Sequence, residues 1–385
     1  MQNWLLPEYI QDMLPDEAWC VEQIRGQVLG LLRKSGYQLV VPPLLEYAES
    51  LLIDGSADMD LRTFKLVDQL SGRTLALRAD ITPQVARIDA HLLNREGVTR
   101  LCYAGSVLHT QPIGLTRTRE LLQIGAELYG HSGVDSDLEI QRLMLQSLAL
   151  LGIANVHLDL GHVAVFRALV QQAGLDQAME GALFAALQNK DSAALQGLVA
   201  GLDSTLCTAL LALPTLYGSC AEVTARARKV FPDHPTIRAA LDDLVVAASY
   251  LEPLAASVEI DLADLRGYHY HSGVAFAAYC DRLPNAIALG GRYDGVGKAF
   301  GRARPATGFT LYLLELARLA PAEPAPGCIR APRRSDPALE AAMASLRRAG
   351  EVVIQDLPGH ENEGDERHCG RELIKRKGKW QVKKI

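Results

Sequence analysis

The chain has 385 residues, 49% of them hydrophobic and 22% charged, which is enough to bury a large core in two or three domains. A formal net charge of -6 argues against attraction of the whole surface to nucleic acid. The seven cysteines lie far apart, without the close pairs of metal fingers or redox motifs, so we expect reduced thiols and a cytoplasmic protein. We expect no secretion signal and no membrane segment, because no apolar run approaches the roughly 18 residues that span a bilayer.

The first ninety residues alternate helical and extended patterns. Apolar residues on one stripe from Val21 to Leu32 predict a helix, which Gly36 closes. Consecutive prolines then favour an extended segment. Residues 64–78 predict a hairpin with its turn at Ser71 and Gly72, and Thr82 begins the next helix.

The middle of the chain changes character twice. Two long strands are predicted around 99–109 and 119–129, followed by a helix over 135–151 and a strand over 157–162. Residues of about 163–250 are rich in alanine and leucine with few strand signals, which indicates a helical insertion. Strand character returns at 258–262, 267–280 and 285–291, and a helix is expected after Gly308.

Residues 321–327 predict a proline-rich linker that separates residues 1–320 from a small C-terminal α/β domain, 328–385, with a basic tail. Hairpins, a helical insertion and a return to strands predict an α+β fold. Its core is an antiparallel sheet flanked by helices, not an alternating parallel fold.

Four segments resemble, in the same order, the motifs of class II aminoacyl-tRNA synthetases, and over about residues 5–320 the chain is similar to histidyl-tRNA synthetase. They are residues 36–46, the region from 75 to the hairpin 105–130, residues 265–276 and residues 290–316. The resemblance implies the class II fold. It also implies a homodimer with Pro43 at its interface.

The chain departs from this family where the family binds ATP. By the resemblance, His109 stands at the arginine that grips the α-phosphate, Gln111 stands at an acidic position beside it, and Glu315 stands at the second arginine. A guanidinium donates two aligned charge-assisted hydrogen bonds to phosphate, each contact being worth roughly 1.5–3 kcal/mol. We therefore expect that amino-acid activation by ATP fails.

The amino-acid end of the family's site is better kept. The resemblance assigns the ammonium and imidazole groups of histidine to a set of polar side chains, since an imidazole presents two ring nitrogens that a carboxylate and a polar group can read. These candidates are Asp80, Thr82, Gln123, Glu127, Arg266, Tyr270 and His271.

A histidyl-synthetase-like core without the ATP arginines or a full anticodon-binding domain is similar to the regulatory subunits of ATP phosphoribosyltransferase, the first enzyme of histidine biosynthesis. The N-terminal run LPEYIQDMLP, with Tyr9 in place of a glycine, agrees with that family. The resemblance implies a non-catalytic subunit without cofactor or metal. It implies a hetero-octamer with four short-form catalytic subunits, which this chain activates and makes sensitive to histidine.

Local alternatives stay open for several of these residues. Glu127 on its strand is also consistent with a paired carboxylate, Arg266 with a structural ion pair, and His109 with an ordinary core residue. His269 and His271 would share one strand face, but no third ligand is spaced to complete a metal site. Residues 290–298 resemble a phosphate loop whose spacing is one residue off.

Two other functions remain open at this point. The first is a divergent histidyl-tRNA synthetase or a related amino-acid ligase. The second is RNA binding through the basic segment 371–385, although a charge run more often forms a solvated face or a contact for an acidic partner. Free histidine has two reasonable sites, the inherited pocket and a subunit interface.

Overall fold

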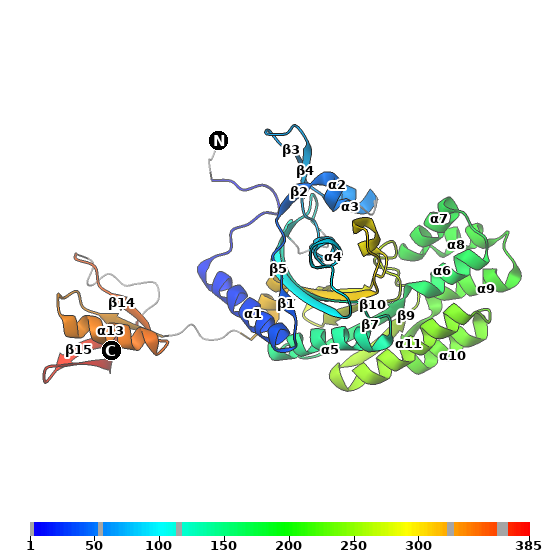
Figure 1. Ribbon diagram of the computed structural model, residues 1–385. Coiled ribbons are helices and arrows are strands. Elements are labelled where there is room, and N and C mark those ends of the chain that lie inside the picture. The colour runs from blue at the N-terminus through cyan, green and yellow to red at the C-terminus, as the bar shows by residue number, and fades with distance from the viewer. Residues whose placement is uncertain (1–3, 53–56, 113–117, 322–326, 360–368) are drawn as a thin grey trace. The chain divides into compact units, whose positions relative to one another are not determined.

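The computed structural model describes residues 4–52, 57–112, 118–321, 327–359 and 369–385. They fall into two compact units, one ending at Pro321 and one beginning after it (Figure 1). Most of the predicted linker 321–327 lies outside the described residues.

The larger unit is built on a sheet in which nine strands of the described chain are hydrogen-bonded. From edge to edge these are β1 (Gln38–Leu39), β5 (Thr99–Leu108), β6 (Glu120–Tyr129), β12 (Ala306–Tyr312), β11 (Leu283–Arg292), β10 (Val274–Cys280), β7 (Val156–His162), β9 (Ser257–Asp261) and β8 (Tyr217–Ser219). Neighbours are antiparallel except for β1 with β5 and β7 with β9. The prediction of an antiparallel α+β fold is confirmed.

A small three-stranded sheet stands beside the first strands. It contains the predicted hairpin, β3 (Lys65–Val67) and β4 (Thr74–Leu77), together with β2 (Leu45–Tyr47). Gly72 has a φ of +71°, which is why a glycine suits the turn.

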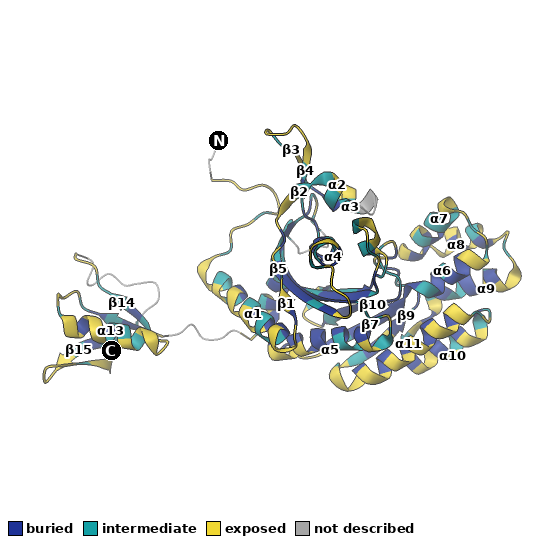
Figure 2. Ribbon diagram, viewed as in Figure 1, coloured by how far each residue is buried: buried dark blue, intermediate teal, exposed yellow. Residues whose placement is uncertain are grey.

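Helices cover both faces of the nine-stranded sheet. One face packs against α1 (Pro15–Lys34), α5 (Val134–Leu150), α12 (Leu313–Leu319) and the insertion, in a continuous apolar core. The other face packs under α4 (Thr82–Arg87) and the turn that follows it, in a separate cluster centred on Tyr103, Tyr129 and Tyr293. Figure 2 shows the result, since the sheet is buried and the outer sides of the helices are exposed.

The insertion is helical, with the short strand β8 inside it. Its helices lie together at one end of the larger unit in Figure 1. They are α6 (Val163–Gln172), α7 (Gln177–Gln188), α8 (Ser192–Val199), α9 (Ser204–Ala212), α10 (Cys220–Val230) and α11 (Pro235–Leu251). Asp176, Asp191 and Asp203 each accept a hydrogen bond from a backbone amide in the first turn of the following helix, which fixes three of these starts.

One secondary-structure prediction was wrong. Residues 267–271 form turns and β10 begins only at Val274, so His269 and His271 do not share a strand face. Gly267 has a φ of +66°, which strand geometry does not allow. The helix expected after Gly308 is confirmed, since Gly308 lies within β12 and α12 begins at Leu313.

The smaller unit holds a four-stranded sheet and one helix. Strand order is β14 (Val352–Gln355), β13 (Cys328–Ala331), β15 (Arg371–Arg376) and β16 (Lys379–Lys384), with α13 (Pro337–Arg348) packed on it. The basic segment is therefore a hairpin and not an extended tail. Lys375 and Trp380 from this hairpin both donate to Asp336, the N-terminal cap of α13.

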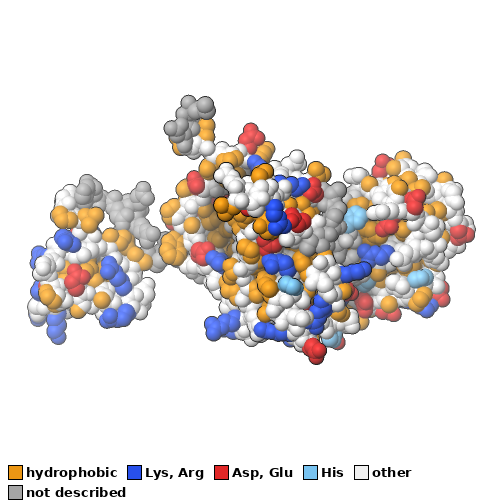
Figure 3. Space-filling model, turned by 45° about the horizontal axis from the view of Figure 1, so that its top comes forward, with side chains coloured by type: hydrophobic (Ala, Val, Ile, Leu, Met, Phe, Trp, Pro, Cys, Tyr) orange, Lys and Arg blue, Asp and Glu red, His pale blue; other side chains and the backbone are white. Residues whose placement is uncertain are grey.

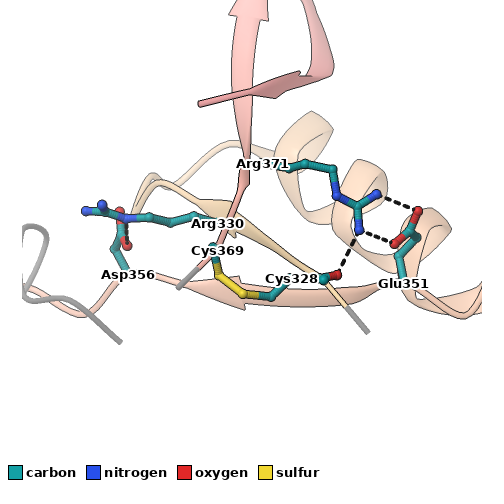
Figure 4. The surroundings of a disulfide bond; sticks show 7 residues. Cys328, Arg330, Glu351, Asp356, Cys369 and Arg371 are labelled. Atoms are coloured by element: carbon teal, nitrogen blue, oxygen red, sulfur yellow. Dashed lines mark hydrogen bonds and ion pairs between the residues drawn. A yellow bond between two sulfur atoms is a disulfide. The ribbon is translucent and has the colours of Figure 1, made fainter. Parts of the chain in front are cut away.

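The expectation that all thiols are reduced was wrong for one pair. Cys328 and Cys369 form a disulfide across 41 positions of sequence (Figure 4). Parallel pairing of β13 with β15 brings the two residues together, and Arg371 binds Glu351 nearby at 2.7 Å. Sequence spacing alone cannot reveal a pair that only the strand order makes adjacent.

Candidate functional site

The first part of the site is set by β6. Gln123 and Glu127 point to the same face of the sheet because they are four residues apart on a strand, and 4% and 1% of their surfaces are exposed. They lie on the side of the tyrosine cluster, beneath α4. Both predicted residues are therefore buried polar groups on one face.

Glu127 is held by Tyr293, the residue that follows β11. Tyr293 donates its hydroxyl hydrogen to Oε2 of Glu127 and also contacts the hydroxyl of Tyr129 at 3.2 Å. Burial raises the pKa of Glu127 to about 8, the hydrogen bond from Tyr293 opposes this shift, and the charge of Asp80 adds to it. The site therefore contains a carboxyl group that titrates near neutral pH.

The start of α4 brings the second predicted pair to the same place. Asp80 accepts from the amide of Ile81 at 2.7 Å, and the hydroxyl of Thr82 lies 3.4 Å from that of Tyr103. Burial also raises the pKa of Asp80. Two carboxyl groups thus occupy one buried site, and the charge of Arg78 acts on that of Asp80.

Tyr270 and His271 line the site from the turn before β10. The ring of Tyr270 lies 5.0 Å from that of Tyr293, and its hydroxyl has no hydrogen-bond partner among the described residues. His271 approaches the backbone of Gly291 so closely that a Cβ there would lie 2.8 Å from its Nε2. Burial lowers the pKa of His271 to about 4, so the ring is neutral at pH 7.

Arg266 is placed apart from the carboxylates of β6 and α4. It binds Asp264 and the hydroxyl of Tyr279, and its guanidinium lies 3.9 Å from Asp159 on β7. These contacts fit the alternative in which Arg266 forms a structural ion pair. Three strands of the sheet, β12, β11 and β10, separate β7 from β6.

The positions assigned to ATP have local partners. The imidazole Nε2 of His109, buried at the end of β5, lies 2.8 Å from the carbonyl oxygen of Ala79 and joins the hairpin to the segment before α4. Glu315 is buried in α12, 3.7 Å from Arg318, and Gln111 is exposed. Residues 113–117 of the hairpin lie outside the described residues.

Pro43 is exposed, and the apolar residues around it are exposed with it. The exposed fraction is 79% for Val41, 40% for Leu44 and 41% for Leu45. The carbonyl oxygen of Pro43 accepts from Gln84 at 2.7 Å, which fixes this segment to α4.

Sequence reasoning missed several residues of the site. Tyr103 and Tyr129 come from β5 and β6, Tyr293 directly follows β11, and Thr310 binds the hydroxyl of Tyr103 at 2.7 Å. Alternation along 99–109 and 119–129 marked Tyr103 and Tyr129 as members of one face, and this was the available signal. Nothing local marked Gly308, whose missing side chain makes room for Glu127.

The described residues contain no group of three or more histidine, cysteine or acidic side chains placed to hold a metal ion. Within the same residues, no helix has both the length and the apolar character needed to cross a membrane. On the face shown in Figure 3, acidic and basic side chains of the larger unit are interspersed with apolar ones.

Known sequence families match nearly the whole chain. Residues 9–316 match the family described as histidyl-tRNA synthetase, and residues 326–383 match the family described as the C-terminal domain of the ATP phosphoribosyltransferase subunit HisZ.

Full-length relatives and solved structures agree with these two family matches. The ATP phosphoribosyltransferase regulatory subunits of Nitrosospira multiformis and Cupriavidus taiwanensis are each 58% identical, with 99% of this chain and 98% of theirs covered. A Bacillus halodurans structure described as ATP phosphoribosyltransferase regulatory subunit/histidyl-tRNA synthetase superposes with a TM-score of 0.82 at 30% identity, covering 93% of this chain and 94% of that one. Histidyl-tRNA synthetase from Nostoc shares the fold, with a TM-score of 0.77 at 17% identity, over 97% of this chain and 92% of that one. The chain belongs to the family of ATP phosphoribosyltransferase regulatory subunits.

Proposed function

We propose that this chain is a non-catalytic subunit that activates the catalytic subunit of ATP phosphoribosyltransferase and makes it sensitive to free histidine. The observation that carries the proposal is the contrast between the two ends of the candidate site. Acidic and hydroxyl groups for an amino acid are assembled on the tyrosine face, whereas a neutral or acidic residue occupies each position assigned to an ATP arginine.

The ATP end lacks the charges that adenylate formation needs. His109 is engaged with Ala79, and Glu315 adds an anion where the family has a guanidinium. Two missing arginine contacts remove several kcal/mol of phosphate binding, at roughly 1.5–3 kcal/mol each.

The amino-acid end suits histidine. Asp80 and Glu127 accept hydrogen bonds when ionised, and the ligand brings an ammonium group and an imidazole, which both donate. Burial makes ionised carboxylates costly here, and a cationic ligand compensates for that cost. We therefore assign histidine to this site in preference to a subunit interface.

The family resemblance supports a proposal for the assembly. We propose a cytoplasmic hetero-octamer of four such chains with four short-form catalytic subunits, in which these chains form dimers through the exposed segment around Pro43. Coupling between histidine on one subunit and catalysis on the other is typically worth about 1–3 kcal/mol. The linkage is reciprocal, so ligands of the catalytic subunit also change the affinity for histidine.

The test is to mix this chain with the short-form catalytic subunit and measure phosphoribosyl transfer at increasing histidine. We expect a higher rate and inhibition by histidine. Glu127→Gln should raise the half-inhibitory histidine concentration at least tenfold and keep the activation, whereas Glu120→Gln at the start of the same strand should change neither. An unchanged rate on mixing contradicts the proposal.

The alternative function is an amino-acid ligase of the histidyl-tRNA synthetase type. The retained amino-acid end is compatible with it. We expect no histidine-dependent exchange between pyrophosphate and ATP. Exchange by protein free of contaminating synthetase would favour the ligase.

A further inference from the structure

A cavity lies on the face of the nine-stranded sheet that is opposite the candidate site. It has a volume of about 150 Å³, and it is bounded by the start of α5, by α11 and by the ends of β7, β10 and β11. Its polar lining comes from Ser132, Asp137, His162, Asp243, Ser272 and Arg292.

The sheet separates this cavity from the candidate site. Along β7, His162 alternates onto the same face as Leu158 and Leu160, which pack in the core shared with α5 and α11. Glu127 and the tyrosine cluster occupy the opposite face. A ligand of one site therefore does not touch the other.

The one arginine in the cavity lining has its donors engaged. Arg292 donates to Oδ2 of Asp137 at 3.0 Å, to Asp294 at 3.2 Å and to the hydroxyl of Ser136 at 2.8 Å. The carbonyl oxygens of His131 and Gly133 accept its remaining hydrogens, at 3.2 and 3.1 Å. This guanidinium has no hydrogen to offer an anion in the cavity.

The cavity lining contains hydrogen-bond acceptors that no donor of the described residues satisfies. Nδ1 of His162, a side chain with 9% of its surface exposed, has no hydrogen-bond partner among the described residues, and neither has Oδ1 of the buried Asp137. The hydroxyl of Thr307 lies close enough to Asp137 to lower its pKa but makes no hydrogen bond of ordinary length to it. The carboxylate of Asp243, half-exposed, lies 3.9 Å from Nε2 of His162, beyond hydrogen-bond reach.

The protonation states of His162, Asp137 and Asp243 also bear on how many acceptors the cavity offers. Burial lowers the pKa of His162 to about 4, helped by the charges of Arg292 and Arg167, so the ring is neutral at pH 7 and one of its nitrogens is an acceptor. Burial raises the pKa of both Asp137 and Asp243, and the charge of Arg292 opposes this shift without cancelling it.

We propose that this cavity binds a compact organic cation, namely a primary ammonium or amidinium group, which donates to Asp137, His162 and Asp243. A cavity of about this volume holds a molecule the size of benzene, so an ammonium group with a short carbon chain fits. Occupation by water alone is the competing outcome, because ordered water also satisfies buried polar atoms.

The experiment is calorimetric titration of the full chain with ethylammonium chloride, and separately with sodium acetate, at constant ionic strength. We expect saturable binding of ethylammonium and none of acetate. Asp243→Asn should weaken the affinity at least tenfold. Asp242→Asn is the matched control, because Asp242 is in the same helix but pairs with Arg228 at 2.6 Å, and it should leave the affinity unchanged.

Two further measurements locate the binding. Glu127→Gln should not change ethylammonium affinity, since a change would place the ligand in the tyrosine-lined site. The ring resonance of His162, assigned with His162→Asn, should shift on titration of the unaltered protein. Absence of binding, equal affinity for acetate or full affinity in Asp243→Asn would overturn the proposal and leave a water-filled cavity.

Discussion

Gly308 and Glu127 face each other on adjacent strands, and their sizes are linked. They are register partners of β12 and β6, and a Cβ on Gly308 would lie 1.6 Å from Oε2 of Glu127. The position therefore requires glycine for space and not for backbone conformation, since its φ is not positive. The glycine lets a carboxylate lie against the sheet.

Gly308→Ala is expected to displace Glu127 and to destabilise the protein by about 1–3 kcal/mol, the usual cost of overpacking. Histidine binding should be lost with it. Calorimetry and denaturant unfolding measure the two effects. Gly197→Ala is the control, because Gly197 is an exposed helical residue with open space at its Cβ position, and it should stabilise by about 0.5–1 kcal/mol.

The raised pKa of Glu127 predicts a pH dependence of stability. The folded protein holds this proton up to a pKa of about 8, whereas the unfolded chain releases it near 4.5. Between these values the folded state binds more protons, so the free energy of unfolding falls as pH rises, by up to about 1.4 kcal/mol per pH unit.

Glu127→Gln removes this contribution. The unfolding free energy of wild type and of Glu127→Gln is measured from pH 5 to 9. The stability of wild type relative to the variant should fall as pH rises to about 8, and above that pH the difference should stay constant. A constant difference across that range would show that Glu127 ionises normally.

At the scale of elements, the smaller unit is closed by its disulfide. Cys328 begins β13 and Cys369 precedes β15, so the bond joins neighbouring strands that are distant in sequence. A cross-link over 41 positions removes chain entropy from the unfolded state that corresponds to about 4 kcal/mol.

Cys369→Ser, or treatment with a reductant, is expected to lower the stability of the smaller unit by about 2–4 kcal/mol. Hydrogen exchange of the full chain should show faster exchange in β13 and β15 and none of this effect in the larger unit. Cys207→Ser, at a free and partly exposed thiol, is the control. If the non-reduced protein yields both Cys328 and Cys369 as alkylated thiols, the bond is absent in solution.

For the whole molecule, the exposed apolar segment around Pro43 predicts self-association. Val41 and Leu44 lie in the connection between β1, an edge strand, and β2, which begins at Leu45. A contiguous apolar surface of this kind is typical of an interface in a soluble protein.

Val41→Glu is expected to convert the dimer to a monomer, because it places a charge in an apolar interface. Light scattering after size exclusion measures the mass. Leu70→Glu is the matched control, since Leu70 is 98% exposed in the turn between β3 and β4 and should leave the dimer intact. A wild-type chain that is monomeric at micromolar concentration contradicts the proposed dimer.

Sequence alone determined the elements whose pattern is local. The helix stripe of α1, the hairpin of β3 and β4, the strands β5 and β6 and the helical insertion follow from periodicity and turn chemistry, which neighbouring residues specify. The order of the motifs along the chain also predicted the fold and the family. Placement of Gln123 and Glu127 on one face also needed only the period of a strand.

Only the tertiary structure decided which distant residues meet. Pairing of β12 with β6 brought Gly308 to Glu127, the order of the small sheet brought Cys328 to Cys369, and the packing of α11 on β7 brought Asp243 to His162. The turn at 267–271 and the partners of Arg266 were decided in the same way. Such contacts depend on strand order and on the space that other side chains leave, and no local pattern carries that information.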